Sequence, residues 1–131
     1  MNVIMANVSG TGGKFDLEER TARFGENIID LCKLITKNAI TLPLISQLVK
    51  SGTSVGANYM EANGACSRKD FASKIYICKK EAQETKHWLR MLCKAEGSNQ
   101  KERIKILWKE TQELVMIFQK ITTSFRNKTG N

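Results

Sequence analysis

The amino-acid sequence predicts an all-α protein, an up-down-up-down antiparallel four-helix bundle. Apolar side chains recur every three or four residues along four long stretches, which is the spacing of one face of an α-helix. Short polar segments join these stretches, and short connections force neighbouring helices to run antiparallel. No stretch shows the apolar-polar alternation of a β-strand. At 131 residues the chain is long enough for one domain with its own core.

The first two helices are indicated by a repeat and by a proline. Apolar residues from Leu17 to Ile35 recur at spacings of three and four, and this repeat defines the first helix. Pro43, the only proline, suits the first turn of the second helix, because an N–H at that position has no partner within the helix. The second helix then continues to about Ala65 through many small and polar residues.

The third and fourth helices have clearer boundaries. Ser67, followed three residues later by Asp70, resembles a capping box that opens the third helix. Gly97 ends it, and the fourth helix has the most regular apolar repeat, from Ile104 to Phe125. We therefore expect a disordered N-terminal segment at 1–14 and a bundle domain at 15–127, with helices at about 16–38, 43–65, 69–95 and 100–126.

The composition is that of an ordinary soluble globular protein, with 41% hydrophobic and 26% charged residues. No apolar run is long enough to cross a bilayer, and the N-terminus lacks the pattern of a secretory signal. We therefore expect a cytoplasmic protein without membrane contact. Its four cysteines fall on or beside apolar faces and are expected to be reduced, structural thiols: Cys32, Cys66, Cys78 and Cys93.

A stripe of basic residues lies on the third predicted helix. Basic residues outnumber acidic ones by 21 to 13, and the net charge of +8 favours an anionic partner such as RNA or DNA. The basic side chains of the third helix recur at spacings that place them on one face, where they can follow a phosphate backbone. The alternative is an ordinary solvated helix face. The candidate nucleic-acid-binding residues are Lys79, Lys80, Lys86, Arg90 and Lys94, with Lys101 and Arg103, followed by Lys105 and Lys109, extending the stripe onto the fourth helix.

Aromatic residues are not interleaved with these basic residues as they are in proteins that bind single strands. Tyr76, Trp88 and Trp108 are the large aromatic residues nearby in the sequence. Contact with a phosphate backbone is therefore better supported than stacking on bases.

The second and third helices are predicted to meet along a thin polar seam, where bundles usually carry Leu and Ile. Antiparallel pairing places Glu61 close to Lys74, and it brings Ser51 and Ser54 toward Glu81. We interpret the seam as a structural network that fixes the register of the two helices. Its residues are Ser51, Ser54, Asn58, Glu61, Lys74 and Glu81.

The alternative to a structural seam is a carboxylate site that binds a ligand or a metal. Glu84-x-x-His87 matches the motif of di-iron bundles, but that design needs two such motifs, and His87 is the only histidine. The heptad phase also places His87 at the outermost position of its helix. No nucleophile is paired with a base. We therefore expect no metal, no cofactor and no enzymatic activity.

Several large apolar residues remain after the core positions are filled. They lie off the core line of the third and fourth helices, where a buried contact between subunits would use them. The sequence therefore predicts a homo-oligomer. The candidate contact residues are Ile77, Trp88, Met91 and Ile106.

The most specific pattern in the chain runs from Gln47 to Leu89. It comprises Gln47, then Ser51-Gly-x-Ser-Val-Gly-Ala-Asn58-x-x-Glu61-Ala62, then Ser67-x-x-Asp70-Phe71-x-x-Lys74, and then Glu81-Ala82-x-Glu84-Thr85-x-x-Trp88-Leu89. This pattern resembles the 23S rRNA intervening-sequence proteins, also called four-helix bundle proteins. The resemblance implies a bacterial cytosolic protein that assembles into a ring-like homopentamer, and it implies no enzymatic activity.

A related branch of that family is the accessory variability proteins of diversity-generating retroelements. These proteins bind nucleic acid and work beside a reverse transcriptase, so the resemblance implies a reverse transcriptase as one candidate protein partner. Two hypotheses follow. The first is a non-enzymatic, oligomeric bundle that binds RNA or DNA electrostatically through its basic helix face. The second is an assembly or adaptor protein that binds other proteins without contacting nucleic acid.

Overall fold

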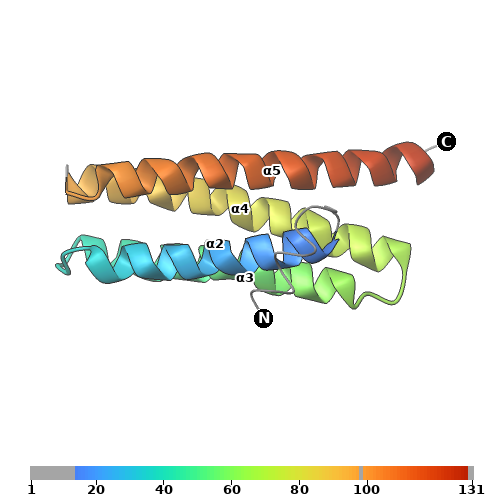
Figure 1. Ribbon diagram of the computed structural model, residues 1–131, viewed down its shortest axis with the longest axis horizontal. Coiled ribbons are helices and arrows are strands. Elements are labelled where there is room, and N and C mark those ends of the chain that lie inside the picture. The colour runs from blue at the N-terminus through green and yellow to red at the C-terminus, as the bar shows by residue number, and fades with distance from the viewer. Residues whose placement is uncertain (1–13, 98, 130–131) are drawn as a thin grey trace.

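A computed structural model describes residues 14–97 and 99–129 of the chain. This part contains four helices and no strand: α2 (Lys14–Leu34), α3 (Thr41–Asn63), α4 (Arg68–Glu96) and α5 (Lys101–Thr129). The helices run alternately up and down along an elongated bundle (Figure 1). The predicted all-α four-helix bundle is confirmed. The disordered segment expected at 1–14 lies outside the described residues, apart from Lys14, which begins α2.

Each helix packs mainly against its neighbours in the chain, and the contact between α2 and α5 that closes the bundle is much smaller. Arg20 of α2 bridges this small contact. Its Nε and Nη2 atoms donate to the two carboxylate oxygens of Glu110 at 2.8 Å each, and Nη2 also donates to Glu113 at 2.7 Å. A two-pronged guanidinium–carboxylate pair is among the stronger polar contacts in proteins. These hydrogen bonds raise the pKa of Arg20 above its usual value.

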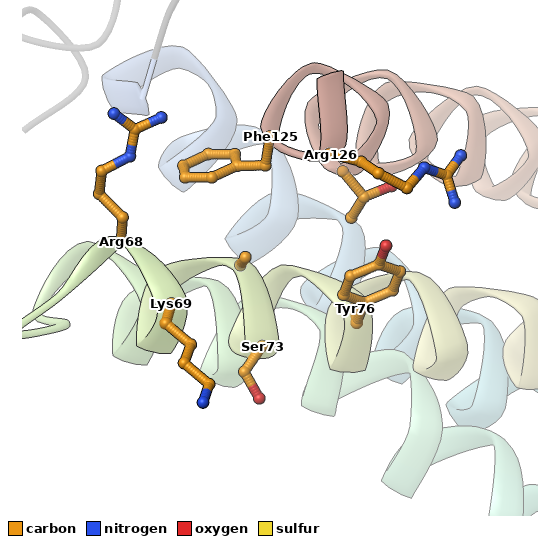
Figure 2. A pocket seen from close by; sticks show the side chains of 8 residues that line it. Arg68, Lys69, Ser73, Tyr76, Phe125 and Arg126 are labelled. Atoms are coloured by element: carbon orange, nitrogen blue, oxygen red, sulfur yellow. The ribbon is translucent and has the colours of Figure 1, made fainter. Parts of the chain in front are cut away.

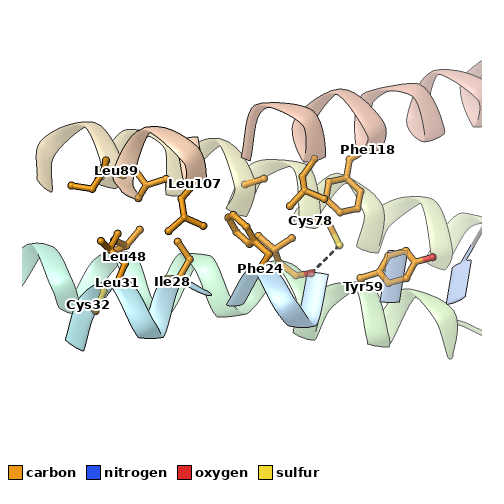
Figure 3. Close-up of a cluster of buried hydrophobic side chains, with 14 of the residues drawn as sticks. Phe24, Ile28, Leu31, Cys32, Leu48, Tyr59, Cys78, Leu89, Leu107 and Phe118 are labelled. Carbon is orange, nitrogen blue, oxygen red and sulfur yellow. Dashed lines mark hydrogen bonds between the residues drawn. The ribbon is translucent and has the colours of Figure 1, made fainter. Parts of the chain in front are cut away.

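The hydrophobic core runs between all four helices (Figure 3). Burying one of its large side chains stabilises the fold by about 1.5–3 kcal/mol relative to leaving it exposed. The largest fully buried apolar residues are Phe24, Ile28, Leu31, Ile35, Leu48, Val55, Ile75, Leu89, Leu92, Leu114 and Phe118.

None of the helices in the described ranges combines the length and the apolar character that a membrane span requires.

Helices α2 and α3 approach each other closely because α3 carries glycines where they meet. A Cβ atom on Gly52 would lie only 2.9 Å from Ile28 Cγ1, and one on Gly56 would lie 3.2 Å from the backbone oxygen of Thr21. Both Ile28 and Thr21 are buried, and the β-branched Ile28 has few alternative rotamers. The small residues that make α3 unusual in sequence therefore permit this close packing.

The connection between α2 and α3 is where the sequence-based boundaries are most in error. Helix α2 ends at Leu34 and not near residue 38, and α3 begins at Thr41, two residues before Pro43. Two side chains set these ends. The Asn38 side chain accepts two N–H groups at the start of α3 at 2.9 Å each, and the Thr41 hydroxyl donates to the Thr36 carbonyl at 2.6 Å. The other boundaries lie within three residues of the expected positions.

Helix α4 begins and ends at residues that suit its termini. The hydroxyl of Ser67 accepts the N–H of Asp70 at 3.0 Å, as the predicted capping box requires. Gly97 follows the last residue of the helix with φ of 83°, a left-handed conformation that favours glycine. The lengths of α4 and α5 carry these two helices beyond the start of α2 at one end of the bundle (Figure 1).

The four cysteines are free thiols in two kinds of environment. Cys32 and Cys78 are buried, and burial raises the pKa of Cys32 to about 11 and that of Cys78 to about 12. Figure 3 shows Cys78, whose thiol donates to the Val55 carbonyl at 3.6 Å. Cys93 is half-buried. Cys66 does not fit the prediction, because it lies in the turn before α4 and is exposed.

Gly52→Ala is expected to destabilise the protein, whereas Gly25→Ala is expected to stabilise it. Both changes bring a gain in helix propensity of about 1 kcal/mol. At Gly52 the new methyl group clashes with Ile28, and overpacking of this kind costs about 1–3 kcal/mol. At Gly25 the nearest atom would be 3.6 Å away, an ordinary contact. Urea unfolding of both variants measures the difference, and equal midpoints would contradict the close approach.

Candidate nucleic-acid interface

Two lysines of α4 are held along the seam between α4 and α5. Lys79 Nζ donates to the amide oxygen of Gln119, and Lys86 Nζ donates to that of Gln112. Both lysines are half-buried, and the two pairs define the antiparallel register of the helices. An amide carries no net charge, so these bonds orient the ammonium groups without neutralising them.

An aromatic side chain lies beside one of these lysines. Lys86 Nζ is 4.7 Å from the centroid of the Trp108 ring, which is a cation–π contact. The sequence alone does not predict it, because Trp108 and Lys86 belong to different helices. The fold therefore places the Trp108 ring beside a basic residue of a different helix.

The remaining basic residues of the predicted stripe are exposed. Helix α4 carries Lys80, Arg90 and Lys94 on its surface, and Lys101 is the first residue of α5. Farther along α5, two exposed lysines line a shallow depression together with Trp108, Ile106 and Glu102. Helical spacing places them on the same side of α5 as Lys101. We call this surface the α4/α5 basic face, and its residues are Lys79, Lys80, Lys86, Arg90, Lys94, Lys101, Lys105 and Lys109.

Arg103 does not belong to the α4/α5 basic face, although its sequence position makes it one of the binding candidates. It lines a depression with Asn27 and Asp30 of α2 and therefore lies on the side of α5 that faces α2. The physical reason is helical geometry. A step of two residues from Lys101 turns the side chain by roughly 200° around the helix.

The ion pairs of the described residues all lie away from the α4/α5 basic face. Arg20 pairs across the α2–α5 contact, and Arg23 pairs with Glu19 at 2.8 Å within α2. Lys74 pairs with Glu61 across α3 and α4. Among the described residues, no cation of the basic face is therefore ion-paired with a carboxylate, although Glu102 lines the same depression as Lys105 and Lys109.

The polar seam between α3 and α4 is largely a set of internal contacts. Glu61 and Lys74 form the expected ion pair at 2.7 Å, and hydrogen bonding to Glu61 raises the pKa of the exposed Lys74. The buried hydroxyl of Ser51 lies 2.9 Å from that of Thr85, with which it forms a hydrogen bond. Thr85 replaces Glu81 as the polar partner that Ser51 meets across the seam.

Two further seam residues hydrogen-bond within α3 itself. Ser54 donates to the carbonyl of Lys50 at 2.6 Å, and Asn58 donates to the carbonyl of Ser54 at 2.8 Å. Glu81 is half-buried on α4. Among the described residues, every buried side-chain nitrogen or oxygen has a hydrogen-bond partner. Satisfied groups of this kind support a structural role for the seam.

The Glu84-x-x-His87 motif lies on the surface of α4. His87 is exposed, with its ring 4.8 Å from the ring of the half-buried Trp88, and the Trp88 N–H donates to Glu84 at 3.1 Å. In the part of the chain that the structure describes, no group of three or more His, Cys, Asp or Glu side chains is placed to hold a metal ion.

The candidate residues for subunit contact have unequal exposure. Ile77, Trp88 and Met91 are half-buried on α4, and Trp88 packs against the core. Ile106 on α5 is 66% exposed. Met116, a surplus apolar residue that is not among the candidate contact residues, is 54% exposed on the same helix.

A groove between the N-terminal part of α4 and the C-terminal part of α5 is not predicted from the sequence (Figure 2). The α4–α5 register provides the signal that would find it. Moving seven residues back from Lys79 and seven forward from Gln119 reaches Ala72 and Arg126, and both line the groove. Its residues are Arg68, Lys69, Ala72, Ser73, Tyr76, Thr122, Phe125 and Arg126.

Comparison with known proteins agrees with the fold and with the pattern in α3 and α4. The sequence model of the 23S rRNA-intervening sequence protein family matches residues 14–120. The chain belongs to this family. The match covers α2, α3 and α4 and most of α5, so membership in the 23S rRNA-intervening sequence proteins rests on nearly the whole bundle.

A solved structure of a protein from Bacteroides thetaiotaomicron is similar to the structure of the present chain. It is described as a protein with unknown function from the S23 ribosomal protein family. The two chains are 30% identical, the match covers 80% of this chain and 96% of that chain, and the TM-score is 0.68. No curated protein sequence gives a significant match. Neither description names an enzymatic activity.

A double-mutant cycle on Ser51 and Thr85 is expected to show coupling between their hydroxyls. Thr85→Val keeps the side-chain shape and removes the hydrogen bond that joins α3 to α4, at a cost of about 1–2 kcal/mol. Ser51→Ala in that background should cost less than it does alone, with a coupling of about 1 kcal/mol. Denaturant unfolding of the four proteins measures this, and strictly additive effects would contradict the contact.

Proposed function

We propose that this family member is a non-enzymatic protein that binds RNA or DNA through the α4/α5 basic face. One observation carries the proposal: among the described residues, the cations of this face have no contacting carboxylate, whereas ion pairs occur elsewhere on the bundle. A surface of unpaired cations releases counterions when it meets a phosphate backbone. Binding of this kind depends on charge and spacing and carries little sequence information.

The orientation of two lysines supports the same proposal. A lysine side chain loses up to about 2 kcal/mol of rotamer entropy when it is fixed in place. Gln119 and Gln112 already restrict Lys79 and Lys86 through hydrogen bonds, so less of this entropy remains to be lost on binding phosphate. Since the family is named for 23S rRNA, a structured rRNA fragment is the first probe to use.

Assembly of several copies is part of the proposal. The side chains of Ile106 and Met116 on α5 are more than half exposed, and the apolar area that they offer favours contact with another chain. In a homo-oligomer, a pentamer by family resemblance, the basic faces of the copies would bind one nucleic acid together, which raises the affinity of a weak site. A cytoplasmic location, where thiols stay reduced, is part of the same proposal.

The alternative function is that of an assembly or adaptor protein. The same exposed residues of α5 favour it, because they offer apolar area to a different protein, for which a reverse transcriptase is the candidate that the family resemblance provides. Under this alternative the charge of α4 has no role. Binding measurements on charge variants therefore separate the two functions.

Replacing Arg90 and Lys94 with Glu is expected to weaken binding to an rRNA fragment and to duplex DNA. Both side chains are exposed on the surface of α4, so folding should be unchanged. The slope of log affinity against log salt should fall by about one for each phosphate that the variant no longer neutralises. Fluorescence anisotropy across a salt titration measures both effects.

The matched control is the replacement of Lys33 and Lys50 with Glu, which changes the net charge equally but on α2 and α3. Binding by this control should stay near that of the unchanged protein at moderate salt. Equal weakening by both variants would contradict a localised site. Absence of binding by the unchanged protein, even at low salt, would refute the proposed function and favour the adaptor alternative.

Ile106→Glu is expected to reduce the oligomeric mass, because it places a charge where apolar contact is proposed. Lys105→Glu alters the adjacent exposed residue and should leave the mass unchanged. Size-exclusion chromatography with light scattering measures the mass against the 14.8 kDa of one chain. A monomeric unchanged protein, or an equal response of both variants, would refute this contact.

A further inference from the structure

The groove between α4 and α5 combines features that the basic face alone does not have. It lies where the first turns of α4 meet the last turns of α5, and its volume is about 810 Å³. Sites for small molecules usually have volumes of about 300–1,000 Å³. The groove is therefore large enough to hold a molecule of nucleotide size.

Two aromatic side chains form apolar parts of the groove. The Tyr76 side chain is 46% exposed, although it stands on a helix that is otherwise well packed. Phe125 packs against Phe71 of α4, with ring centroids 5.2 Å apart, which fixes the position of its ring. A base of any identity can stack on the exposed Tyr76 ring, because every base has a π face, and Phe125 lines the groove beside it.

Cations surround these rings. The guanidinium of Arg68 lies 5.3 Å from the centroid of the Phe125 ring, and Figure 2 shows the two side by side between α4 and α5. Arg126 lies on the other side of Phe125, where the Tyr76 hydroxyl points toward α5. Lys69 adds a third cation, and none of the described residues that line the groove is acidic. Guanidinium groups bind phosphate oxygens in a two-pronged manner.

We propose that this groove holds one unpaired nucleotide of the bound strand, with its base against Tyr76 and the backbone phosphates on either side of that nucleotide on Arg68 and Arg126. The proposal rests on the proposed function, in that the nucleotide belongs to the nucleic acid held by the α4/α5 basic face. It adds a preference that the basic face cannot provide. Bases in a duplex are paired and stacked, so only a single strand, a loop or a flipped base reaches the groove.

Charge and shape together select this occupant. An acidic peptide would satisfy the three cations but would leave the exposed Tyr76 ring without a flat partner. Inorganic phosphate would bind the arginines alone. A nucleotide is the chemistry that uses the cations and the aromatic rings at the same time.

The first experiment titrates the whole protein with adenosine 5′-monophosphate and follows backbone amide shifts by NMR. Shifts are expected at Arg68, Tyr76 and Phe125. Tyr76→Ala should weaken the affinity about tenfold, a loss typical of one stacked base, whereas Tyr76→Phe should retain it. Tyr76 is exposed, so its removal leaves the core intact. Inorganic phosphate and a glutamate-rich peptide serve as comparison ligands.

The second experiment compares an oligoadenylate single strand with a blunt RNA duplex of equal length by fluorescence anisotropy. Tyr76→Ala should weaken binding of the single strand about tenfold and leave duplex binding unchanged. The Arg90→Glu, Lys94→Glu variant should weaken binding of the single strand and of the duplex. It removes cations that contact the phosphates of either nucleic acid.

The outcomes separate the two proposals. No shift with millimolar adenosine 5′-monophosphate, or equal affinity for inorganic phosphate or for the peptide, overturns the nucleotide groove. If the duplex still binds and responds to Arg90→Glu, Lys94→Glu, the proposed function survives that failure. If the mononucleotide binds in the groove but neither strand binds, the groove stands as a nucleotide site and the proposed function is refuted.

Discussion

The close approach of α2 to α3 is the constraint on which the rest of the bundle depends. Gly52 and Gly56 let the two backbones come near enough for Ile28 and Thr21 to fill the space that larger side chains of α3 would occupy. Helix α3 also meets α4 partly through hydroxyl side chains, as in the hydrogen bond between Ser51 and Thr85. The core still draws apolar side chains from all four helices, and α3 contributes Leu48, Val55, Tyr59 and Ala62.

Much of the fold follows from the sequence, because heptad spacing reports directly which face of a helix is buried. The spacing also predicts that Glu61 meets Lys74, since one short turn fixes the register of the hairpin. Heptad spacing does not predict a helix end that is set by side-chain hydrogen bonds. Asn38 starts α3 through its own hydrogen bonds, so α2 ends although apolar residues continue.

The candidate site is predictable only in the part that lies on one helix. Spacing along α4 shows that its basic residues share a face, but it does not show which residues of α5 lie beside them. Arg103 points toward α2, and Trp108 reaches Lys86. The groove needs residues from the start of α4 and the end of α5, about fifty positions apart in the chain, and only the register between the helices brings them together.

The small contact between α2 and α5 has a consequence for how the chain folds and opens. Every other helix pair joins neighbours in the chain, so its contacts form at low cost in loop entropy, and folding dominated by such contacts is fast. Closure of α2 onto α5 joins the two ends of the bundle through a small contact that includes the ion pairs of Arg20, and we expect this closure to form late in folding. We expect the same boundary to separate first in local fluctuations, before the more extensive contact between α3 and α4.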